Sequence, residues 1–77
     1  MDYILNKNPQ MNTSYHKIHT QKCAKRPKEE NVIQLGNCMC PIEAKSRAKE
    51  YYENVNGCKY CCREIFFKKW KEFLSWN

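Results

Sequence analysis

Two closely spaced pairs of metal-ligand residues constrain this chain more than any other feature. His19 and Cys23 are separated by three residues, and Cys58 and Cys61 by two. Either spacing lets both side chains of a pair turn toward one point, and a structural zinc ion takes four such ligands in a tetrahedron. The sequence therefore predicts one closed Zn²⁺ site that holds the fold together and leaves no coordination position for a substrate.

The length of the chain makes such a staple necessary. Its 77 residues correspond to one domain. A hydrophobic core of this size contributes only ~3–5 kcal/mol of stability. The six cysteines leave two other staples open, because Cys38 and Cys40 could join Cys58 and Cys61 around the ion, or the cysteines could form disulfides. We expect Cys62 to be a buried thiol.

The ends and apolar runs of the chain indicate a cytoplasmic protein with reduced thiols. The first residues lack the basic segment and long apolar run of a secretory signal. The longest purely apolar run, Ile65 to Phe67, is far shorter than the ~20 residues of a membrane-spanning helix. Metal binding suits this compartment better than disulfides do.

The chain divides into three segments of an expected α+β fold. They are a loosely ordered N-terminal arm over residues 1–13, a zinc-binding domain over 14–61, and a C-terminal amphipathic helix over 62–77 packed on the same domain. The arm is rich in Asn and has no sustained period. The C-terminal helix has an apolar face broad enough to pack in the core or to dock on a partner protein.

A short β-sheet with one helix packed on it is predicted within the zinc-binding domain. Alternation over residues 14–20 indicates a strand, on which His16 faces away from His19. The β-branched segment 32–35 indicates a second strand, which we expect to pair with the first. Apolar residues at helical spacing then predict a helix of about 13 residues that begins at Pro41 and that Gly57 ends.

The net charge of +6 is concentrated near the N-terminus, where residues 1–28 hold six Lys and Arg against Asp2 alone. A basic surface favours anionic partners, and nucleic acid first among them. The residues that we expect to contact phosphates are mostly in the loop between the two strands: Lys17, Lys22, Lys25, Arg26, Lys28 and Arg47.

These residues together resemble the Ada-type metal-binding domain, the N-terminal zinc module of DNA-alkylation repair proteins and of small relatives. The two ligand pairs, the basic loop, Asn31 before a short strand and the helix over 46–57 carry the resemblance across roughly residues 15–61. It implies a mixed sheet with a helix packed on it and a surface that meets DNA. Residues 36–45 depart from the family pattern as an insertion.

The resemblance also implies a difference in chemistry. In the repair proteins, the first ligand of the first pair is a zinc-bound thiolate that accepts a methyl group from DNA phosphotriesters, and this chain has His19 there. An imidazole on zinc is a far poorer nucleophile than a zinc thiolate. The sequence also lacks paired carboxylates, a Ser/His/Asp set and a Gly-rich phosphate loop. We therefore expect a non-enzymatic DNA-binding module, with a protein-interaction module as the alternative and methyl acceptance disfavoured.

Overall fold

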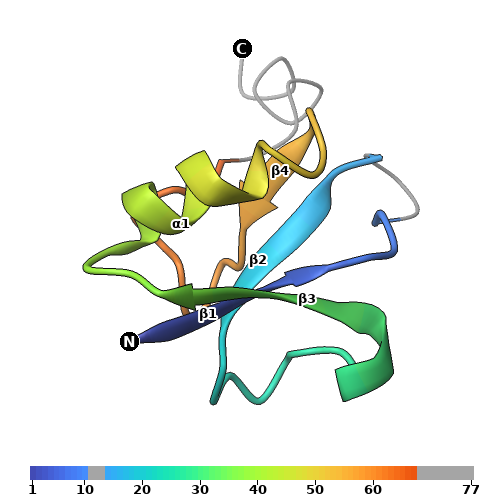
Figure 1. The fold of residues 1–77 in the computed structure, drawn as a ribbon, viewed down its shortest axis with the longest axis horizontal. Helices are drawn as coiled ribbons and strands as arrows, with labels where there is room; N and C mark the ends of the chain where they lie inside the picture. The colour runs from blue at the N-terminus through green and yellow to red at the C-terminus, as the bar shows by residue number, and fades with distance from the viewer. Residues whose placement is uncertain (11–13, 68–77) are drawn as a thin grey trace, which may run out of the picture.

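A four-stranded mixed sheet with one helix on it makes up the fold in the computed structural model, which describes residues 1–10 and 14–67 (Figure 1). The strands lie in the order β3-β1-β2-β4; β2 and β4 are parallel and the other pairs antiparallel. The α+β prediction is confirmed at this level. The elements are β1 (Asp2–Asn6), β2 (His16–Thr20), a 3-10 turn (Glu29–Asn31), β3 (Val32–Asn37), α1 (Pro41–Ala48) and β4 (Val55–Gly57).

Residues 2–6 form strand β1 in the middle of the sheet and not the loosely ordered arm predicted from the sequence. Tyr3, Ile4 and Leu5 are all buried, and β1 pairs with β2 on one side and β3 on the other. A short run of consecutive apolar residues is typical of a strand that is covered on both faces. β1 lies between β2 and β3, so the expected direct pairing of these two strands does not occur. Residues 11–13 of the expected arm lie outside the described residues.

The predicted helix is shorter than expected, because α1 ends at Ala48. Ala44 and Ala48 are fully buried, as their spacing predicted. Val55 does not continue the helix. It begins strand β4, which pairs in parallel with β2 and buries the Val55 side chain. Strand pairing and burial outweigh the helical pattern here, so Gly57 is a strand residue and not the end of a helix.

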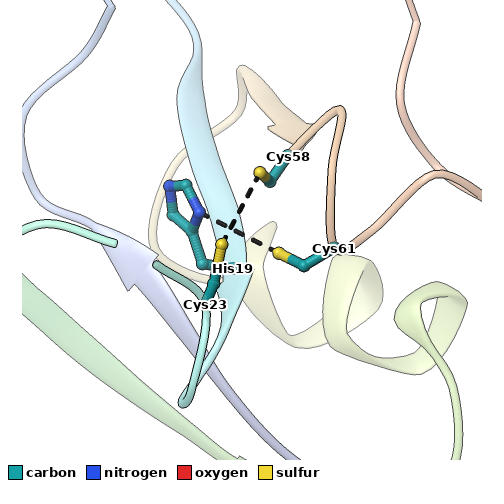
Figure 2. Close-up of side chains that lie close together, drawn as sticks. All are labelled: His19, Cys23, Cys58 and Cys61. Atoms are coloured by element: carbon teal, nitrogen blue, oxygen red, sulfur yellow. Dashed lines mark hydrogen bonds between the residues drawn. The ribbon is translucent and has the colours of Figure 1, made fainter. Parts of the chain in front are cut away.

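Strand β2 presents different side chains to its two faces. Ile18 faces the core and is fully buried. His19 lies on the opposite face and is paired with Ile4 of β1; its side chain lies beside the three cysteines (Figure 2). His16 turns away from His19 as predicted. Its ring stacks on Tyr52 with centroids 3.6 Å apart. β2 therefore contributes Ile18 to the core on one face and His19 to the candidate ligand cluster on the other.

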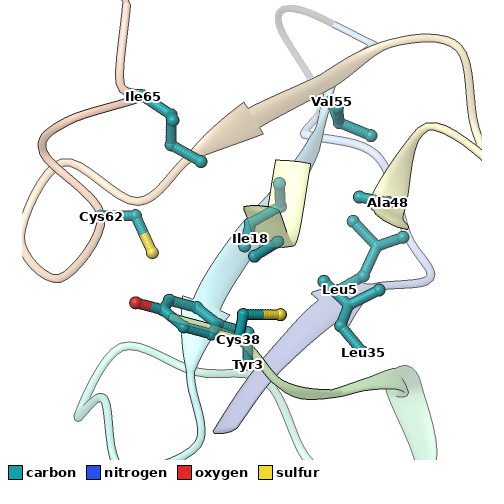
Figure 3. Close-up of a cluster of buried hydrophobic side chains, with 10 residues drawn as sticks. Tyr3, Leu5, Ile18, Leu35, Cys38, Ala48, Val55, Cys62 and Ile65 are labelled. Atoms are coloured by element: carbon teal, nitrogen blue, oxygen red, sulfur yellow. The ribbon is translucent and has the colours of Figure 1, made fainter. Parts of the chain in front are cut away.

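The core lies between the sheet and α1, and the segment after β4 completes it (Figure 3). Gly57 is needed for this closure. A Cβ atom there would overlap Ile65 Cγ1 and would stand 2.6 Å from the Cys62 carbonyl oxygen, closer than real Cβ contacts. The buried residues of this cluster are Tyr3, Leu5, Ile18, Leu35, Cys38, Ala44, Ala48, Val55, Cys62 and Ile65.

Residues 62–67, the start of the expected C-terminal helix, are not helical and contain a turn at residues 63–65. Asn56 holds this segment, because its amide donates to the Phe67 carbonyl (2.8 Å) and accepts from the Phe67 N–H (3.0 Å). Residues 68–77, on which the predicted protein-docking helix depends, lie outside the described part of the chain. Within residues 1–10 and 14–67, no helix is long and apolar enough to cross a bilayer.

Candidate metal centre

The two predicted ligand pairs meet at one point beside β2 (Figure 2). The ligand atoms of His19, Cys23, Cys58 and Cys61 all lie within 4.8 Å of one another. Cys23 Sγ is 3.9 Å from Cys58 Sγ, and His19 Nδ1 is 4.0 Å from Cys61 Sγ. Ligand atoms on a tetrahedral zinc ion with bonds of ~2.0–2.3 Å stand ~3.3–3.8 Å apart. The four side chains are thus close enough to coordinate one metal ion after a small contraction.

The parallel pairing of β2 and β4 explains how ligands so distant in sequence meet. The Cys58 N–H donates to the Ile18 carbonyl (2.9 Å), which continues the β2–β4 ladder and sets Cys58 beside His19. One turn follows each strand: the Cys23 N–H donates to the Thr20 carbonyl (3.1 Å), and the turn after Cys58 presents Cys61. Strand β4, which occupies the end of the segment predicted as helix, therefore positions the second ligand pair.

Each of the three sulfur atoms accepts a backbone hydrogen bond. The Lys25 N–H donates to Cys23 Sγ (3.4 Å), and the Tyr60 N–H donates to Cys58 Sγ (3.4 Å). The Thr20 N–H donates to Cys61 Sγ (3.3 Å). Amide donors aimed at a sulfur favour the thiolate, which is the form that binds metal, and they fix its orientation.

The protonation states of three ligands also bear on metal binding. Burial, with Lys17 and Arg26 nearby, lowers the pKa of His19 to about 4, so the folded chain presents a neutral imidazole at neutral pH. Burial acts to raise the pKa of Cys58, but amide hydrogen bonds from Cys61 and Tyr60 outweigh it and lower that pKa. Burial raises the pKa of the Cys61 thiol well above its usual value. A bound cation would offset that cost, since it stabilises the thiolate.

The alternative staples are not assembled in the structure. All six cysteines are free thiols, so no disulfide is present. Cys38 is buried, with its thiol 3.7 Å from the Gly36 carbonyl, and Cys40 is the residue before α1; neither belongs to the ligand cluster. Cys62 is fully buried, as predicted, although its sulfur lies 3.7 Å from Cys61 Sγ.

The six basic residues proposed from the sequence fall into two groups. Lys22, Lys25 and Lys28 are exposed on the loop between β2 and β3. Arg26, in the same loop, instead folds back: its Nη1 donates to the Gln21 carbonyl (2.9 Å), and its guanidinium pairs with Glu29. It therefore shapes the loop that the three lysines occupy.

Lys17 and Arg47 also make contacts within the domain. Lys17 Nζ lies 3.3 Å from the Gly57 carbonyl oxygen and 4.9 Å from the centroid of the Phe66 ring. Arg47 Nη1 donates to the carbonyls of Leu35 (2.9 Å) and Asn37 (3.0 Å), and its Nη2 pairs with Glu43. These contacts favour structural roles for both side chains.

Sequence reasoning missed Lys59 and Tyr60, the two residues between the ligands Cys58 and Cys61. Both are exposed beside the metal centre. The sequence pattern that could have indicated them is an aromatic residue and a cation between the two ligands of one pair, because the side chains of such a turn cannot all face the ion.

Comparisons of the chain with protein-family models, with curated proteins and with solved structures gave no significant match.

Proposed function

We propose that the chain is a structural-zinc domain that binds nucleic acid. Three thiols and one imidazole in a four-ligand cluster are the donor set of many structural zinc sites, and their softness favours Zn²⁺ over harder cations. Because the protein supplies all four ligands, the ion would have no open position. Its role would then be to hold the β2 and β4 turns together and not to activate a substrate.

The observation that supports nucleic-acid binding is the exposure of three lysines on a loop anchored to this centre. Cys23 fixes the start of the loop, and the Arg26–Glu29 pair fixes its course. Lys22, Lys25 and Lys28 all reach solvent from it. Ammonium groups held on an ordered loop can neutralise successive phosphates, and the release of counterions would drive the association.

Kinship with Ada-type domains is part of the same proposal, and it favours DNA as the partner. The mixed sheet with one packed helix agrees with the fold that the resemblance implied. The resemblance matches His19 to the methyl-acceptor position, and the His19 side chain is buried with its Nδ1 4.0 Å from Cys61 Sγ. We therefore propose binding without methyl transfer, in a non-catalytic protein.

Charge reversal in the loop tests the proposal. Lys22→Glu with Lys28→Glu should reduce the magnitude of the negative slope of log affinity against log salt for duplex DNA by about 1.8, because each lysine would neutralise one phosphate. Lys49→Glu with Arg63→Glu is the matched control, since it changes net charge equally at exposed positions outside the loop. Equal effects of the two double variants, or no binding by the unmodified protein, would contradict the proposal.

A further inference from the structure

The turn between Cys58 and Cys61 exposes a tyrosine flanked by two lysines. Tyr60 is 64 % exposed, and its ring centroid lies 5.4 Å from Lys25 Nζ and 5.7 Å from Lys59 Nζ. Lys25 belongs to the other ligand turn, two residues after Cys23. Both ligand turns thus contribute to one surface, the Tyr60 platform, which consists of Lys25, Lys59 and Tyr60.

The backbone of this platform is held by the candidate metal centre itself. The amides of Tyr60 and Lys25 both donate to ligand sulfurs, those of Cys58 and Cys23. An aromatic side chain has few rotatable bonds, so a fixed backbone leaves its ring largely preorganised. A large exposed aromatic ring on an ordered turn offers a face to a planar ligand.

We propose that the Tyr60 platform binds single-stranded nucleic acid, with one base stacked on the Tyr60 ring and the adjacent phosphates at Lys25 and Lys59. This inference rests on the proposed nucleic-acid function and names its preferred substrate. Base–aromatic stacking is stronger than the contact of an exposed lysine with a ring. An incoming base would therefore displace the ammonium groups from the ring and leave them free for phosphates.

Single strands fit this surface better than duplexes do. In a duplex, the faces of the bases are already stacked on one another, and a lone exposed ring reaches them only if a base unpairs. Bases of a single strand are free to stack, and stacking tolerates any sequence because every base has a flat face. The Tyr60 platform should therefore distinguish strandedness and not sequence.

Replacing Tyr60 tests the inference. Tyr60→Ala should weaken binding of a short oligothymidylate by about 5- to 150-fold and leave binding of a fully paired, blunt-ended duplex within about twofold. Tyr60→Phe keeps the ring and should bind like the unmodified protein. Tyr51→Ala is the matched control, because Tyr51 is 55 % exposed on the turn after α1. Lys59→Gln should lower the salt slope for single strands by about 0.7.

A spectroscopic measurement separates stacking from charge. The emission of 2-aminopurine in the oligonucleotide should be quenched by the unmodified protein and by Tyr60→Phe, and not by Tyr60→Ala. One bound metal ion per chain in every variant verifies that the fold is intact. If Tyr60→Ala weakens single-strand and duplex binding equally, or changes neither, the proposal that a base stacks on Tyr60 is refuted. The loop lysines could still account for nucleic-acid binding in that case. If the unmodified protein binds no nucleic acid, both proposals fail.

Discussion

Replacing Arg47 tests whether its guanidinium stabilises the fold or contacts a phosphate. Arg47→Met keeps an apolar stem and removes the guanidinium, which donates to the Leu35 and Asn37 carbonyls and pairs with Glu43. The register of β3 against β1 is shifted between Gln34 and Gly36, so Leu35 has no cross-strand partner there. Arg47 Nη1 donates to the carbonyl of this unpaired residue (2.9 Å), so the Arg47 side chain ties α1 to the irregular part of β3.

The expected loss follows from these contacts. Hydrogen bonds from a charged donor contribute ~1.5–3 kcal/mol, and the partly exposed ion pair adds at most about 1 kcal/mol. Because one Nη1 serves both carbonyls and Asn37 is exposed, we expect Arg47→Met to lower the free energy of unfolding by about 2–3 kcal/mol. Urea unfolding at a fixed, buffered concentration of free zinc measures this difference. The exposed Arg63→Met should change it by less than about 0.5 kcal/mol.

The same variant must also leave nucleic-acid binding unchanged. If the Arg47 guanidinium is occupied by backbone carbonyls, the salt slope for DNA should stay the same in the folded variant. Unaltered stability together with a slope reduced by about 0.9 would show that Arg47 contacts a phosphate, and its structural role would be refuted.

Three further changes probe the centre and its supports. Gly57→Ala should cost about 1–3 kcal/mol of stability in the same urea assay, because the new Cβ would overlap Ile65; a neutral result would contradict the close packing. Cys58→Ser should abolish metal binding in equilibrium dialysis whereas Cys38→Ser should retain it, and loss of metal in both would favour the other ligand set. Proton release on metal binding, from calorimetry in buffers of different ionisation enthalpy, should rise by about one as pH falls from about 7.5 to 5.5. We expect this because the metal-free chain is unfolded and its His19 takes up a proton near pH 6.5, whereas folding lowers that pKa to about 4. The stability of the metal-bound fold should therefore decrease as the pH is lowered through this window. Constant proton release would indicate a metal-free chain that is already folded.

The fold was only partly predictable from the sequence, and the misses have a common cause. Strand β2 and the start of α1 follow local patterns, alternation in one and Pro41 with buried alanines in the other. Strand β1 has only three consecutive apolar residues, and Val55 fits a helical face as well as a strand. Both became strands through pairing with β2, which is a long-range interaction that local periodicity does not report.

The candidate metal ligands were more predictable than the proposed nucleic-acid-binding surface. Ligand spacing is a strong local constraint, because two side chains two or three residues apart must reach one ion, and the four predicted residues do come together. Positive charge gives no such geometric constraint. The sequence predicts Arg26 and Arg47 as surface cations, yet their guanidiniums donate to backbone carbonyls. Lys59 and Tyr60 became candidates only because the fold places them beside Lys25.

The coordination of a bound zinc ion tests the central claim most directly. X-ray absorption at the zinc edge of the protein purified without chelators should show one zinc per chain with three sulfur atoms at ~2.3 Å and one nitrogen at ~2.0 Å, from Cys23, Cys58, Cys61 and His19. Four sulfur ligands, or a folded chain that retains no metal, would contradict it.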